Sequence, residues 1–89
     1  MNLDDVLIEA SESGNTKLVG MCLGRRANVH AREDEALRRA SERGHTAIVK
    51  LLLDAGADVH AENDGALGWA SSNGRLKVVK YLESIGCKL

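Results

Sequence analysis

Hydrophobic positions in the middle of the chain follow the spacing of two short helices. Over residues 36–44 the apolar and small side chains are spaced by three and four residues, which places them on one face of a helix. Residues 48–53 are apolar on most sides, and such a helix is expected to be buried between neighbours. Gly44 and Gly56 are expected to end the two helices, because glycine tolerates the left-handed conformation of a C-terminal cap.

The same pattern occurs three times along the chain, at an offset of 30 residues and without a gap. The residues that recur at this offset are Ala10, Ala40 and Ala70; Ser11, Ser41 and Ser71; Gly14, Gly44 and Gly74; Val19, Val49 and Val79; and Asp4, Asp34 and Asp64. They define the segments 4–33, 34–63 and 64–89. Each aspartate is expected to cap the first helix of its segment, and a short extended connector such as 57–61 is expected to end it.

Helices of about ten residues are too short to be stable alone in water, so the hairpins must bury their apolar helices against one another. We therefore expect an all-α solenoid of three stacked helix-turn-helix repeats with short connectors, forming a single domain over residues 1–89. Glu83 replaces the leucines of positions 23 and 53, which predicts that the last segment caps the stack. Gly20 and Arg26, the latter at the position of Gly56, make the first segment the least regular.

Two stretches of the middle segment, ALRRASERGH at 36–45 and IVKLLLDAGADV at 48–59, resemble the ankyrin repeat. The resemblance covers nearly the whole chain. The period of 30 is shorter than the usual 33, and the missing residues lie where the family places its β-hairpin finger. In this shortened form the chain is similar to repeats of large DNA viruses and protists. The resemblance implies a concave surface, formed by the first helices, that contacts a partner protein.

The resemblance places the partner-binding positions at the exposed ends of the first helices. They are Glu12, Ser13, Arg38, Arg39, Glu42, Arg43, Trp69, Ser72 and Asn73. Trp69 is either an anchor for the partner, since interface hot spots are enriched in Trp, or an amphipathic filler half-buried between repeats. The three arginines either meet an acidic partner or form a solvated face paired with Glu35 and Glu42.

Charge and cysteine content narrow the classes of partner and the location. The net charge of −1 argues against a nucleic-acid or anionic-membrane surface, and no apolar stretch approaches the roughly 18 residues needed to cross a bilayer. Cys22 aligns with leucines at 52 and 82, and Cys87 lies two repeats away, beyond the roughly 7 Å limit for a disulfide. Reduced thiols and an acidic N-terminus predict an intracellular protein, most readily cytoplasmic.

The residue pattern does not point to catalysis or to a cofactor. His30 and His60 occupy one repeat position, so they are expected about 10 Å apart, too far to share a metal ion. The serines of the first helices have no histidine nearby to activate them, and the carboxylates form no acid–base pair. We therefore expect no enzyme activity, no metal and no cofactor.

Three functions remain open at this point. The first is a non-enzymatic protein–protein interaction module, an adaptor or inhibitor that binds a partner through the concave face. The second is a self-associating structural module, suggested by the consecutive Val6, Leu7 and Ile8 and by segment charges of −1, −2 and +2. The third is a model or designed scaffold without an evolved partner. A monomer is expected, and weak self-association is left open as the alternative.

Overall fold

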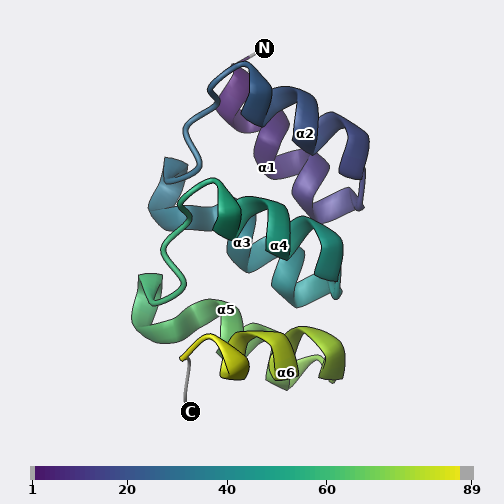
Figure 1. Ribbon diagram of the computed structural model, residues 1–89, viewed down its shortest axis with the longest axis vertical. Coiled ribbons are helices and arrows are strands. Elements are labelled where there is room, and N and C mark those ends of the chain that lie inside the picture. The colour runs from purple at the N-terminus through teal and green to yellow at the C-terminus, as the bar shows by residue number, and fades with distance from the viewer. Residues whose placement is uncertain (1, 87–89) are drawn as a thin grey trace.

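Three helical hairpins follow one another along the chain in the computed structural model, which describes residues 2–86 (Figure 1). The helices are α1 (Leu3–Ser13), α2 (Thr16–Gly24), α3 (Ala31–Arg43), α4 (Thr46–Asp54), α5 (Ala61–Ser72) and α6 (Leu76–Ser84). Over residues 2–86 there is no strand, and no helix has both the length and the apolar character needed to cross a membrane. The predicted all-α stack of helix-turn-helix units is confirmed.

The first helices of the hairpins form one layer and the second helices form another. In the first layer α3 packs between α1 and α5, and in the second layer α4 packs between α2 and α6. The stack measures 35 × 19 × 18 Å, and its long axis runs across the helices from the first hairpin to the last. Each interior helix therefore has a neighbour on both sides, as the repeat pattern predicts.

The core lies between the two layers and is built from equivalent positions of the repeats. Leu7, Leu37 and Leu67 of the first layer are at most 1% exposed. The three recurring alanines are at most 3% exposed, so the first helices approach each other across small side chains. In the second layer the equivalent core residues are Cys22, Leu52 and Leu82. The buried Cys22 is thus a small apolar core residue, as its alignment with leucine predicts.

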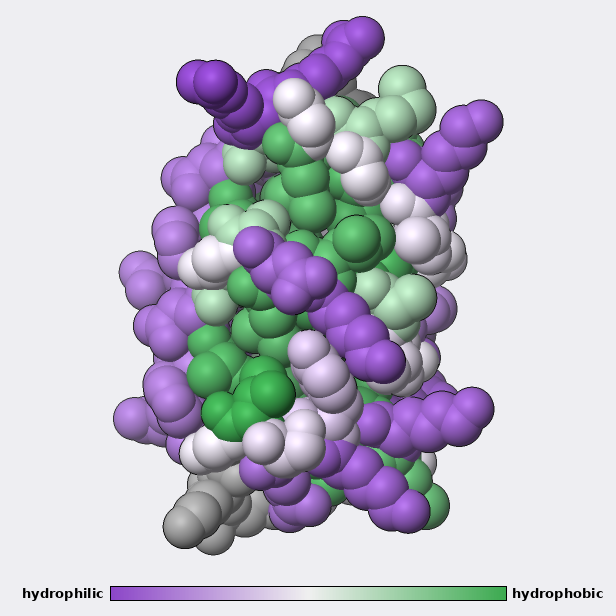
Figure 2. Space-filling model, in the orientation of Figure 1, coloured by the Kyte–Doolittle hydropathy of each residue, from purple (hydrophilic) through white to green (hydrophobic). Residues whose placement is uncertain are grey.

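The second helices are less completely buried than their composition predicts. In α4, Ile48, Val49 and Leu52 are buried, whereas Leu51 and Leu53 are only partly covered. Figure 2, in which the second helices lie toward the viewer, shows apolar side chains running along this face between hydrophilic ones. The reason is that this layer covers the core from one side only.

The aspartates that begin the segments do not cap the helices, so that prediction is wrong. Asn2 caps α1 by accepting the Asp4 N–H at 2.7 Å, and the Asp4 carboxylate accepts the Asn28 N–H at 2.7 Å. Asp34 accepts a hydrogen bond from the ring Nδ1 of His30 at 2.8 Å. The equivalent pair in the next repeat is His60 and Asp64, at 2.5 Å. These carboxylates thus fasten the connectors to the helices.

The connectors are turns and not the extended segments predicted. The Asn28 and Asp58 side chains each accept the backbone N–H of the histidine two residues later at 2.9 Å, which closes a turn. Three consecutive left-handed residues follow in each case, at 32–34 and at 62–64, with φ between 56° and 60°. The chain reverses sharply there, before the regular part of α3 or α5 begins.

The two ends of the stack differ in what they expose. Ser11 and Ser41 are fully buried, but Ser71 at the equivalent position of α5 is exposed, as is Glu83. These two polar positions agree with the cap prediction, but Leu76 and Ile85 of the same repeat are also exposed, at 69% and 43%. Of the consecutive Val6, Leu7 and Ile8, which suggested self-association, Leu7 and Ile8 are 0% and 6% exposed and belong to the core, and Val6 is partly buried against it. Cys87 lies outside the described residues.

Arg26 keeps the left-handed conformation that glycine adopts in the other repeats. Its φ is 65°, whereas Gly56 and Gly86 have φ of 99° and 111°. The preceding helix α2 does not end early, because Gly24 aligns with Asp54, the last residue of α4. A side chain in this conformation costs roughly 1–2 kcal/mol.

We predict that Arg26→Gly raises the free energy of unfolding by about 1 kcal/mol, because it relieves this strain. Urea denaturation followed by circular dichroism measures the change. Gly56→Ala, where an added Cβ meets no atom within 4 Å, is the matched reverse change and should lower stability by a similar amount. An Arg26→Gly variant that is less stable than the parent contradicts the strain.

Candidate functional site

The solvent-facing side of α1, α3 and α5 carries three shallow hollows. We call this side the first-helix surface and define it by the residues that line the hollows. Those of α1 and α3 are Asp5, Ile8, Glu9, Glu12, Arg32, Glu35, Arg38, Arg39 and Glu42. Those at α5 are Asn63, Asp64, Gly65, Gly68, Trp69 and Ser72. The surface therefore contains most of the predicted partner-binding residues.

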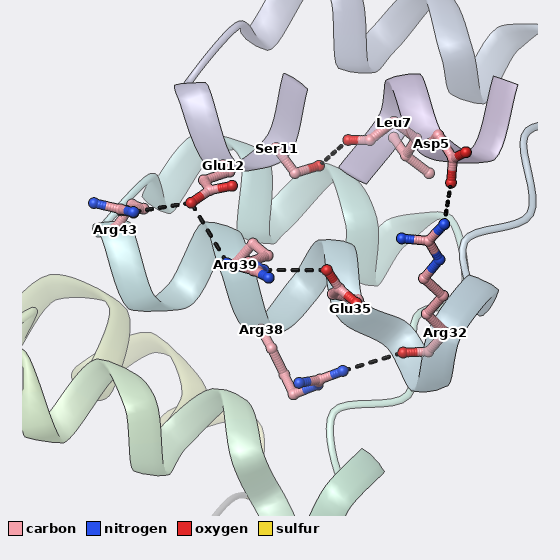
Figure 3. A network of polar contacts seen from close by, with 9 residues as sticks. All are labelled: Asp5, Leu7, Ser11, Glu12, Arg32, Glu35, Arg38, Arg39 and Arg43. Atoms are coloured by element: carbon pink, nitrogen blue, oxygen red, sulfur yellow. Dashed lines mark hydrogen bonds and ion pairs between the residues drawn. The ribbon is translucent and has the colours of Figure 1, made fainter. Parts of the chain in front are cut away.

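Ion pairs join α1 to α3 across the first-helix surface (Figure 3). Glu12 Oε2 lies 2.9 Å from Arg43 Nη2 and 3.5 Å from Arg39 Nη1. Arg39 Nε also donates to Glu35 Oε2 at 3.1 Å. Arg39 and Arg43 are therefore paired, as one of the two alternatives expected. The carboxylates are Glu35 and, in place of the expected Glu42, Glu12 of the neighbouring repeat, whose pairing the sequence did not indicate.

Arg38 is held differently from the other two arginines. Its Nη2 donates to the Arg32 carbonyl oxygen at 3.1 Å, and its Nε is buried without a hydrogen-bond partner. Its side chain lies across α5 at Gly65, where an added Cβ would come within 3.1 Å of Arg38 Cδ. Gly65 therefore makes room for Arg38, whose guanidinium donates to a backbone carbonyl and forms no ion pair within residues 2–86.

Trp69 is the large apolar side chain of the first-helix surface. It is 50% exposed and borders two hollows, one shared with Glu35, Arg38, Arg39 and Glu42, and one on α5 beside Gly65 and Gly68. No residue of 2–86 accepts a hydrogen bond from its indole N–H. Half of the ring is thus available to a partner, together with one unpaired donor.

The remaining predicted residues divide into two groups. Ser13 and Asn73 donate to carbonyl oxygens of their own helices, Ala10 at 3.3 Å and Trp69 at 2.8 Å, and neither lines a hollow. Ser72 and Glu42 do line hollows, and within residues 2–86 the Glu42 side chain has no hydrogen-bond or ion-pair partner. The surface thus retains Ser72 and Glu42, whereas Ser13 and Asn73 stabilise helix ends.

His30, His60 and the buried Ser11 each contact a group four residues away along the chain. No group of three or more His, Cys, Asp or Glu side chains is close enough there to hold a metal ion. His30 and His60 each contact the aspartate of their own turn. The Ser11 hydroxyl donates to the Leu7 carbonyl at 2.7 Å, so it faces a backbone acceptor and not a base.

The comparisons with known proteins agree with this geometry. The family model for ankyrin repeats (3 copies) matches residues 7–89. The match covers most of the chain, so the protein belongs to the ankyrin-repeat family, whose members are generally non-enzymatic protein-interaction modules. No curated protein matched the chain.

Cys22 is predicted to be unreactive in the folded protein. Burial raises the pKa of its thiol, and the charge of Arg25 offsets part of this rise. In a Cys87→Ser variant, a disulfide reagent at pH 8 should label Cys22 only slowly, and urea should restore fast labelling. Because the folded pKa is raised, stability should fall as the pH rises past about 9, where the thiol of the unfolded chain ionises first. Rapid labelling without urea contradicts this prediction.

Proposed function

We propose that this chain binds a partner protein through the first-helix surface, with Trp69 at the centre of the contact, and that it acts as an adaptor or inhibitor. The observation that carries the proposal is the exposure of Trp69 between two hollows. The exposed part of a tryptophan side chain contributes little to the packing of the stack, and Trp is enriched in interface hot spots.

The surface is also fixed before a partner arrives. The opposite sides of α1, α3 and α5 are held by the buried leucines and alanines, and the Glu12, Glu35 and Arg39 side chains restrain one another. A rigid surface loses little conformational entropy on binding, which favours affinity. The mechanism is therefore steric and non-covalent.

We further propose that the chain acts as a monomer in the cytoplasm and folds as one domain of three repeats. The burial of Leu7 and Ile8 supports a monomer, because two of the three consecutive apolar residues that suggested self-association belong to the core of the chain itself. The single described cysteine is buried and free, which suits a reducing compartment.

The test compares Trp69→Ser with Met21→Ser, because the two side chains are 50% and 51% exposed but lie on α5 and α2, in different layers. Partners captured from cells that express the chain are identified by mass spectrometry, and their affinities are then measured by calorimetry. Loss of a hot-spot tryptophan should weaken binding by at least about tenfold, and Met21→Ser should change it little.

Two outcomes contradict the proposal. One is a partner that Trp69→Ser retains at full affinity. The other is a partner lost with Met21→Ser but not with Trp69→Ser, which places binding on the second helices. Circular dichroism of both variants establishes that they remain folded.

A further inference from the structure

The chemistry of the first-helix surface changes from one end of the stack to the other. Three positions of each first helix recur at the 30-residue offset. They are Asp5, Glu9 and Glu12 on α1; Glu35, Arg39 and Glu42 on α3; and Gly65, Trp69 and Ser72 on α5. At these three positions the surface is therefore acidic on α1 and uncharged on α5.

The hollow between α1 and α3 has an excess of negative charge. Four carboxylates line it, from Asp5, Glu9, Glu12 and Glu35, together with the guanidiniums of Arg32 and Arg39, and Arg43 outside the hollow also pairs with Glu12. Arg32 lies 2.9 Å from Asp5, and Arg39 is shared by Glu12 and Glu35. Glu9 is exposed and forms no ion pair within residues 2–86. This end of the surface thus attracts a cationic group.

The hollow on α5 has room for an apolar side chain. Gly65, Gly68 and Trp69 line it; the Arg38 side chain lies against Gly65, whereas an added Cβ at Gly68 meets no atom within 4 Å. The carboxylate in this hollow, Asp64, is occupied by the His60 ring at 2.5 Å. A ring or branched aliphatic group placed here covers the exposed face of the indole.

We propose that the partner presents an extended segment with two anchors, a bulky apolar side chain in the hollow beside Trp69 and a basic side chain at Glu9. Glu9 and Trp69 are equivalent positions two helices apart, about 20 Å if neighbouring helices lie about 10 Å apart. An extended chain covers that span in about six residues. This inference rests on the proposed function and adds the chemistry of the partner.

An acidic partner fits the surface less well. Arg39 and Arg43 are paired with carboxylates, and the Arg38 guanidinium donates to a backbone carbonyl. An acidic segment must break these pairs and must also approach the unpaired Glu9 and Glu42. The arginine cluster is therefore a scaffold between the two anchors and not the anchor itself.

The experiment selects phage-displayed random dodecapeptides on the immobilised full-length chain. The expected peptides carry a Leu, Ile, Phe, Tyr or Trp side chain and a Lys or Arg about five to seven residues apart. The strongest peptide is then synthesised, and its affinity for variants is measured by fluorescence anisotropy at low and high salt.

Each anchor has a matched control variant. Gly68→Leu fills the hollow on α5, and Gly20→Leu makes the same change in α2, where an added Cβ also meets no atom within 4 Å. Both variants should fold, because leucine is a better helix former than glycine. Glu9→Gln removes the free carboxylate, and Glu83→Gln removes an exposed carboxylate of α6. Gly68→Leu should weaken binding by about tenfold or more and Glu9→Gln by about threefold with a smaller salt dependence, whereas the controls should bind as the parent does.

The outcomes separate two claims, namely that the first-helix surface binds the partner and that the partner has an apolar and a basic anchor. Peptides that lack the two-anchor pattern but lose affinity with Trp69→Ser overturn the partner chemistry and leave the proposed surface standing. Peptides that bind Trp69→Ser as well as the parent overturn the surface too. Acidic peptides, no enriched peptide, or equal losses in Gly68→Leu and Gly20→Leu overturn the inference.

Discussion

The structure depends on close packing between the first helices of successive repeats. A helix of 9 to 13 residues is marginal in water, so a single hairpin of this chain cannot be stable by its own hydrogen bonds. Neighbouring first helices approach each other closely because the side chains between them are small, at Ala10, Ala40 and Ala70. The core beneath is filled by Leu7, Leu37 and Leu67. Every other feature, including the first-helix surface, depends on this contact being repeated at the same register.

The same contact determines the available surface. Because one side of α1, α3 and α5 is buried at fixed positions, the opposite side presents side chains that recur every 30 residues in sequence and lie side by side in space. Glu12 reaches Arg43, 31 residues later, only because of this stacking. The pairs between α1 and α3 hold these charges in place, and at α5 glycine and tryptophan line a hollow whose one carboxylate, Asp64, is bonded to the His60 ring. The chain thus combines a fixed charged region with an open apolar one.

The fold could be predicted from the sequence because the pattern occurs three times, so that each position can be compared with its equivalents in the two other repeats. Core positions such as Leu37 and Ala40 followed from this comparison. The aspartate caps could not be predicted correctly, because a carboxylate accepts from whichever donor the turn brings near it. The three left-handed residues at 32–34 bring the His30 ring to Asp34, and no local propensity indicates such a turn. The pairing of Arg43 with Glu12 and the hollow beside Gly68 were also missed, because both depend on contacts between repeats. The one sequence signal for the hollow is that Gly68 stands where the preceding repeat has Arg38.

Circular dichroism of a synthetic peptide with residues 34–63 tests the dependence on stacking most directly. This segment contains a complete set of core residues and lacks only its neighbours. If the helices depend on packing between repeats, the peptide shows little helix in buffer, whereas the full chain is helical and unfolds cooperatively. A peptide that alone is as helical as the same residues in the full chain contradicts the account.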